Sequence, residues 1–139
     1  MKKNKYLERC EKLLPEIELK ANQLINSLKE YGFKIKKPYI ENLEDPKIEL
    51  VLIKFNIIIV YQRINIVNVE FVACPVDEKK FRYSAYILEG KADTLLMRNF
   101  ITEMHEMSKK EYYSFDDMAK SFLNRNKETF VSFRNLINR

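Results

Sequence analysis

His105, the only histidine of the chain, lies in the segment ITEMHEMSKK beside Glu103 and Glu106. Histidine and carboxylate side chains can act as general acids and bases or bind metal ions. A metal site needs three or four ligands that converge, and the chain contains neither the HExxH nor the HxxxH spacing. No GxSxG motif supplies a nucleophile for His105 to activate. The sequence therefore predicts that His105 is an ordinary residue on a helix surface and that the protein holds no metal.

Other residue types with chemical potential are sparse. The two glycines, Gly32 and Gly90, cannot form the glycine-rich loop that binds nucleotide phosphates, which excludes Rossmann and P-loop enzymes. Adjacent acids occur in predicted turns or a first helical turn, where acids are common: Glu44 with Asp45, Asp77 with Glu78, and Asp116 with Asp117. We therefore expect a protein without catalytic residues and without a cofactor.

One segment resembles a nuclease core. After the first predicted helix, the sequence IELVLIKFNIIIVYQR (residues 48–63) resembles the PD-(D/E)xK nuclease family, in which an acid opens one strand and an acid-x-Lys triplet ends the next. Glu49 stands at the first acid position, but Tyr61, Gln62 and Arg63 replace the triplet. The second metal-binding carboxylate is therefore missing, and a two-carboxylate Mg²⁺ site cannot be assembled. The resemblance implies an inactive relative that binds nucleic acid without cutting it.

The composition is typical of one globular domain. The chain has 139 residues, of which 46% are hydrophobic and 32% charged, and its nine Phe and eight Tyr can fill a single core. Cys10 and Cys74 lie far apart without a CxxC spacing, which favours reduced thiols in a cytoplasm. The N-terminus lacks the apolar run of a secretion signal, and the longest uncharged stretch, residues 55–62, is much shorter than the roughly 20 residues of a membrane helix. We predict a single cytoplasmic α+β domain over residues 1–139, with no membrane contact.

A helix is predicted at the N-terminus. Apolar residues recur at steps of three and four from residue 7 to residue 31, and Gly32 suits the left-handed position that ends a helix. Pro15 interrupts this pattern, and we expect a kink there because the apolar stripe keeps its phase. In the alternative, the regular helix starts near Leu14 with Pro15 in its first turn.

The middle of the chain predicts an antiparallel meander of four or five strands. Phe33 and Ile35 begin a short edge strand with Pro38 near its end, and residues 41–46 form a polar connection. Residues 48–63 are rich in β-branched residues, which favours strands at 48–54 and 57–63 with a turn at residues 55–56. A single long strand over 48–61 is the alternative. Alternation then predicts strands from residue 65 to 74 and from residue 81 to 90, with a turn between them.

Two further helices are predicted at the C-terminus, packed on the sheet. The first carries an apolar stripe over residues 96–107, and Asp93 can cap it. The second follows Ser114 and Asp117, which form a variant capping box. Together with the meander, these elements define the α+β fold class.

The outward face of the predicted meander offers a candidate protein interface. It carries Tyr86, Leu88, Val72 and Arg82, and Tyr and Arg are favoured at protein interfaces. The competing interpretation is that these residues lie under the closing helices. Because catalytic motifs are absent from the sequence, we favour a small non-catalytic inhibitor or adaptor, like the bacterial immunity proteins and phage anti-defence proteins. Its partner would be another protein, such as a toxin, a nuclease or a defence effector.

A basic nucleic-acid-binding domain is the second possibility. The net charge is +5, and residues 1–40 contain ten Lys and Arg against five Glu. Clustered cations bind phosphates with release of counterions, and Tyr39 and Phe33 are possible stacking groups. The same charge is also ordinary for solubility in a small domain. The candidate contacts are Lys2, Lys3, Lys5, Lys34, Lys36, Lys37 and Arg63.

The edge strand that begins at Phe33 bears on the oligomeric state. It could pair with its copy in a second subunit, but lysines at positions 34 and 36 and Pro38 discourage edge pairing. We expect a monomer or a weak homodimer.

Overall fold

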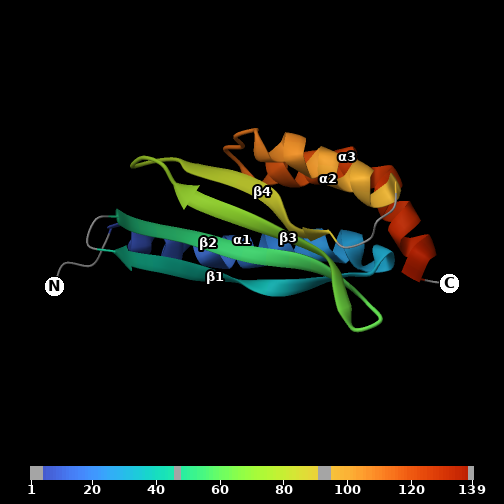
Figure 1. The fold of residues 1–139 in the computed structure, drawn as a ribbon. Coiled ribbons are helices and arrows are strands. Elements are labelled where there is room, and N and C mark those ends of the chain that lie inside the picture. The colour runs from blue at the N-terminus through green and yellow to red at the C-terminus, as the bar shows by residue number, and fades with distance from the viewer. Residues whose placement is uncertain (1–4, 46–47, 91–94, 138–139) are drawn as a thin grey trace.

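The protein has an α+β fold in which one antiparallel sheet is covered by helices (Figure 1). A computed structural model describes residues 5–45, 48–90 and 95–137. The predicted fold class is confirmed, with four strands in the order β1-β2-β3-β4. The elements follow along the chain as α1 (Lys5–Leu28), a 3-10 turn η1 (Lys29–Tyr31), β1 (Phe33–Asp45), β2 (Ile48–Tyr61), β3 (Ile64–Pro75), β4 (Phe81–Gly90), α2 (Leu95–Ser108) and α3 (Phe115–Ile137).

The strand β2 is longer than the favoured prediction. The predicted turn at Phe55 and Asn56 is wrong, and the alternative of one long strand is confirmed. Phe55 pairs with Phe71 and Asn56 pairs with Glu70, in the middle of the β2–β3 ladder. The rings of Phe55 and Phe71 stack with centroids 4.8 Å apart, and Phe55 is buried. Strand β3 provides a continuous partner, and the Phe55 ring is buried in the core. The β2–β3 ladder therefore extends beyond the average length of a strand.

The strand β1 also extends further than predicted. It runs from Phe33 to Asp45, so the short strand ending near Pro38 and the polar connection over residues 41–46 are wrong as far as Asp45. Pro38 is accommodated by a register shift between Lys36 and Tyr39, and β1 lies at the edge of the sheet, where a missing N–H is tolerated. Polar residues after Ile40 are tolerated in this strand because β1 is an edge strand, whose backbone pairs with β2 on one side only.

Helix α1 includes Pro15, so the alternative start near Leu14 is wrong, and the kink expected at Pro15 stays a prediction. After Leu28 the chain tightens into η1 and ends at Gly32, whose φ of 93° is left-handed. The Gly32 N–H donates to the Lys29 carbonyl at 3.1 Å. The predicted role of Gly32 as the terminating residue is confirmed, because a residue with a Cβ resists this backbone conformation.

The Ser114 half of the predicted capping box is confirmed at the start of helix α3. The Ser114 hydroxyl accepts a hydrogen bond from the Asp117 N–H at 3.1 Å, which satisfies one of the free donors of the first turn. The predicted cap of α2, Asp93, lies outside the described residues.

The core lies between the helices and one face of the sheet. Phe33 of β1 and Phe71 of β3 each make an edge-to-face contact with Phe122 of α3, at centroid distances of 6.5 and 5.2 Å. Asn126 of α3 is fully buried; its amide donates to the Phe122 carbonyl, and its side-chain oxygen has no partner in the part of the chain that the structure describes. Among the described helices, none is long and apolar enough to cross a membrane.

All three helices pack on the same side of the sheet. An ion pair joins α1 to α3 between Lys20 and Asp116 at 3.2 Å, and α3 joins α2 through Arg125 and Glu103 at 3.1 Å. Buried residues of each helix belong to one cluster with the inward residues of the sheet. Figure 1 shows α1 behind β1 and β2, with α2 and α3 beyond β4. The opposite face of the sheet is therefore left without a helical cover among the described residues.

Candidate functional site

The uncovered face of the sheet, called the open face below, gathers residues from all four strands. Directly paired residues share a face of a sheet, and alternate residues along a strand share it too. Lys54 of β2 pairs with Tyr39 and with Val72, and Glu70 of β3 pairs with Asn56 and with Tyr86. By this register the open face includes Lys34, Lys36, Tyr39, Glu41, Leu52, Lys54, Asn56, Ile58, Asn68, Glu70, Val72, Cys74, Arg82, Ser84, Tyr86 and Glu89.

A cluster of charged residues occupies the centre of the open face. The Lys54 ammonium lies 2.5 Å from a Glu41 carboxylate oxygen and 3.9 Å from Glu70. The Tyr86 hydroxyl donates a hydrogen bond to the other oxygen of Glu70. These four residues, called the central cluster below, link β1, β2, β3 and β4 across the sheet. The exposed fractions of the Glu70 and Lys54 side chains are only 11% and 20%, so the cluster is set into the face and not spread over it.

The central cluster shifts the proton affinities of its members. The hydrogen bond with Glu41 raises the pKa of Lys54, and this outweighs the lowering by partial burial. Burial raises the pKa of Tyr86, and its hydrogen bond to the Glu70 carboxylate raises it further. Lys54 therefore stays protonated and Tyr86 stays neutral throughout the physiological range.

Apolar side chains form the floor around the central cluster. Leu52 and Val72 have exposed fractions of 7% and 8%, yet neither belongs to the core cluster under the helices. They are buried by their neighbours on the open face itself. Tyr39 stands at the side of this floor with an exposed fraction of 48%. The arrangement offers apolar area, a fixed pattern of charge and an exposed ring.

The structure brings together three of the four residues predicted as a protein interface. Tyr86, Val72 and Arg82 lie on the open face and not under the helices. Arg82 is exposed and lies 3.6 Å from Glu111. Leu88 falls at a register shift between the pairs Val69–Ile87 and Asn68–Glu89, so strand alternation does not assign it to either face; it is 50% exposed.

The residues of the central cluster on β1, β2 and β3 are not among the residues predicted for the interface. Lys54 and Glu41 were not singled out, because the predicted turn at residues 55–56 placed Lys54 at a strand end and residues 41–46 outside the sheet. Glu70 lies in the predicted strand of residues 65–74, but its partners Lys54 and Tyr86 could not be paired with it from the sequence. Alternation along a single long strand over residues 48–61 would have placed Lys54 on the same face of the sheet as Leu52. Asn56 was missed because it falls in the predicted turn, and Asn68 was missed because its partner is Asn56; their side chains form a hydrogen bond of 2.9 Å beside the central cluster.

The predicted nucleic-acid contacts do not form one patch. Lys2 and Lys3 lie outside the described residues, and Lys5 begins α1, where it lies 3.9 Å from Glu78. Helix α1 has 24 residues, so roughly 36 Å separate Lys5 from the end of the helix. The second group lies beyond the end of α1, with three lysines in β1 and Arg63 in the β2–β3 turn. Within the described residues these side chains are exposed and form no ion pair: Lys34, Lys36, Lys37 and Arg63.

One of the two proposed stacking residues is unavailable. Phe33 has an exposed fraction of 2% and packs against Phe122, Phe130 and Phe133. It is a core residue because β1 alternates, and position 33 faces the helices while position 34 faces solvent. Tyr39 alone remains accessible for a base.

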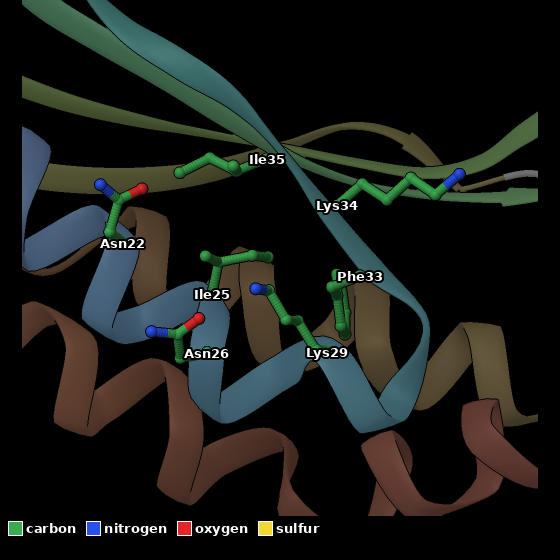
Figure 2. Close-up of a pocket in the computed structure, with 7 residues that line it drawn as sticks. All are labelled: Asn22, Ile25, Asn26, Lys29, Phe33, Lys34 and Ile35. Carbon is green, nitrogen blue, oxygen red and sulfur yellow. The ribbon is translucent and has the colours of Figure 1, made fainter.

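A groove of about 580 Å³ lies between the end of α1 and the start of β1. Figure 2 shows Asn22, Ile25 and Lys29 reaching toward the space below Ile35, while the Lys34 side chain points away from it. The described residues that line the groove include no carboxylate, histidine or cysteine, so it offers no general base, nucleophile or metal ligand. The lining residues are Asn22, Ile25, Asn26, Lys29, Phe33, Lys34 and Ile35.

The residues with catalytic potential are dispersed. His105 is exposed on α2, while Glu103 is paired with Arg125 and Glu106 with Lys109. Among the described residues, no group of three or more histidine, cysteine or acidic side chains is arranged to hold a metal ion. Cys10 and Cys74 are both free thiols.

The two positions of the nuclease resemblance lie at opposite ends of one strand. Glu49 is near the start of β2 and Tyr61 is its last residue, so about 40 Å separates them at the usual rise of a strand. The family pattern instead needs both positions near one metal. The juxtaposition implied by the resemblance is therefore not reproduced, whatever the residue at position 61.

Comparison of the chain with models of known protein families, with curated proteins and with solved structures gave no significant match.

Proposed function

We propose that the protein is a small non-catalytic binding protein, an inhibitor or adaptor that acts by surface complementarity through its open face. The observation that supports this proposal is the central cluster, in which Glu41, Lys54, Glu70 and Tyr86 are held on an uncovered sheet face around the apolar floor of Leu52 and Val72. Protein interfaces typically combine a desolvated centre with a more exposed polar rim.

The partner that we propose is another protein, such as a toxin, a nuclease or a defence effector. A partly desolvated pattern of fixed charges selects a surface with the matching pattern and rejects others, because an unpaired buried charge is costly. Two free cysteines fit action in a reducing compartment such as the cytoplasm. The proposal is thus one of recognition, in the manner of immunity and anti-defence proteins.

A steric block tests the proposal. Ser84 lies on the open face opposite Val72, and its side chain forms no hydrogen bond within the described residues. Its replacement, Ser84→Arg, adds a long charged side chain over the floor. The matched control is Ser27→Arg on the exposed side of α1. Tagged wild-type protein and both variants are expressed in the native host, and the proteins that copurify are quantified by mass spectrometry.

We expect a specific protein partner to be recovered with the wild type and with Ser27→Arg, and recovery to fall at least about tenfold with Ser84→Arg, as for a blocked interface centre. Equal thermal unfolding of the three proteins excludes misfolding as the cause. Recovery of nucleic acid alone, or equal recovery of the partner with Ser84→Arg, contradicts the proposal.

Nucleic-acid binding is the second candidate, and the unpaired cations Lys34, Lys36, Lys37 and Arg63 favour it. Such binding is electrostatic and falls steeply between about 50 and 200 mM salt. Ser84→Arg adds a positive charge, so it should strengthen this kind of binding while it blocks a protein interface. Oligonucleotide binding by the wild type that is undetectable at low salt contradicts the second candidate.

A further inference from the structure

The β2–β3 hairpin extends beyond the rest of the sheet. The first pair of β1 with β2 is Phe33–Ile59, and the last pair of β3 with β4 is Val67–Gly90, while Ile59 and Val67 pair with each other. Both neighbouring strands therefore stop at the same row. The two strands of residues 60–66, called the finger below, continue alone for about 10 Å, and Figure 1 shows them projecting at the lower right.

The turn of the finger is built from residues that do not suit it. Gln62 and Arg63 have φ values of 51° and 65°, the positive values that a two-residue hairpin turn of type I′ requires. Asn-Gly is the usual choice there, because a side chain with a Cβ resists the left-handed region. The β3–β4 turn shows the usual solution, in which the Asp77 carboxylate accepts hydrogen bonds of 2.8 Å from the N–H groups of Lys79 and Lys80.

The side chains at the tip of the finger are presented to solvent, whereas Ile66 at its base has an exposed fraction of 8% and belongs to the core cluster. Gln62 and Arg63 are exposed, and Ile64 has an exposed fraction of 52%. Arg63 is the only charged residue from position 57 to position 69. The finger therefore carries one cation at its tip, flanked by apolar residues, on a backbone held in a costly conformation.

The geometry points to the finger as an element that inserts into an acidic cleft of the protein partner, and we propose it as a second contact in addition to the open face. The proposal rests on the proposed protein-binding function. A guanidinium at the tip matches carboxylates at the bottom of a cleft, and the exposed Ile64 side chain matches an apolar wall. A phosphate backbone instead favours several cations and offers no apolar wall. The lysines of β1 begin outside the finger with Lys34, which pairs with Ile58, and the finger itself carries only Arg63, so a protein cleft fits it better.

Replacement of the two turn residues of the finger should change stability and partner affinity in opposite directions, which separates an effect on binding from an effect on folding. The double replacement Gln62→Asn with Arg63→Gly supplies the residues that a type I′ turn prefers, and it removes the tip side chain. We expect Tm to rise by about 4 °C, because the strain is relieved, and affinity for the partner to fall at least about tenfold. The matched control, Lys79→Ala, removes an exposed cation from the other turn and should leave both quantities unchanged.

Photo-crosslinking identifies what the finger contacts. The crosslinker p-benzoylphenylalanine replaces Ile64 in the finger, Tyr39 on the open face, or Val76 in the β3–β4 turn as the control; these side chains are 52%, 48% and 42% exposed. In the native host we expect position 64 to crosslink to partner peptides that surround a cluster of Asp and Glu, and position 76 to give none.

The outcomes distinguish this proposal from the function on which it rests. Crosslinks from position 39 without crosslinks from position 64 overturn the finger and leave the open face intact. The absence of protein crosslinks from both positions overturns both. Crosslinks from position 64 to DNA or RNA, or an affinity that survives the turn exchange, also overturn the proposal.

Discussion

The charged residues of the central cluster are difficult to explain by stability alone. Partial burial of Lys54, Glu41 and Glu70 removes water from three charges, and such ion pairs often contribute little net free energy of folding compared with apolar residues. Their value lies in a fixed pattern of charge, because each side chain is held by a neighbour on another strand. Tyr86 completes the pattern by satisfying the second oxygen of Glu70.

Tyr86 gives the cluster a measurable dependence on pH. Its pKa is raised in the folded state, chiefly by burial, so above about pH 10, the ordinary pKa of tyrosine, the folded protein binds more protons than the unfolded chain. Stability must then fall as pH rises. We expect the urea midpoint of the wild type to fall more steeply above pH 10 than that of Tyr86→Phe, because phenylalanine has no proton to lose.

The comparison isolates Tyr86, because the other tyrosines with raised pKa values, Tyr31, Tyr83 and Tyr113, are present in both proteins. Midpoints of unfolding in urea at several pH values provide the measurement. A constant difference between the two proteins from pH 7 to pH 11 would contradict the burial of the phenol.

At the scale of the elements, local patterns predicted most of the fold and long-range pairing decided the rest. The left-handed Gly32 and the cap at Ser114 depend on residues close in sequence, and both were predicted correctly. The length of β2 depends on β3, whose Phe71 stacks on Phe55 in the middle of the ladder. A rule based on neighbouring residues cannot take Phe71 into account, so the average strand length predicted a turn at residues 55–56 that the structure does not contain.

The candidate site was only partly predictable for the same reason. Tyr86, Val72 and Arg82 belong to β3 and β4, whose alternation was read correctly, and they were found. Lys54 and Glu41 belong to β1 and β2, whose bounds were wrong, and they were missed. The predicted strands end at residue 63 and begin again at residue 65, close to the observed turn at Gln62 and Arg63. The positive φ values of these two residues run against turn preferences and could not be predicted from the sequence.

Strand β1 provides a direct test of which face of the sheet is structural. Phe33→Ala removes a ring that packs against Phe122, Phe130 and Phe133, and we expect it to lower the free energy of unfolding by about 3 to 5 kcal/mol. Tyr39→Ala on the same strand removes an exposed ring and should change it by about 0.5 kcal/mol or less. Denaturant titrations measure both, and similar losses would contradict the assignment of the two faces.

At the scale of the whole molecule, the two edges of the sheet differ. The edge of β4 is partly closed, because Tyr83 exchanges backbone hydrogen bonds of 2.7 and 3.2 Å with Tyr112. The edge of β1 is long, and an uncovered edge can pair with another chain. Exposed lysines at positions 34, 36 and 37 and the register shift at Pro38 oppose that pairing through charge repulsion and a missing N–H.

These features predict a monomer whose solubility depends on the edge of β1. Light scattering after gel filtration should show a monomer for the wild type, and a dimer or larger species for the triple replacement Lys34→Val, Lys36→Thr and Pro38→Val, because two edges could then join in register. Replacement of Lys120 by Val and Lys127 by Thr on exposed positions of α3 removes the same charge without exposing an edge, and should leave a monomer. A monomeric triple variant would show that something other than the lysines and Pro38 keeps this edge unpaired, whereas association of the α3 variant would show that net charge alone controls assembly.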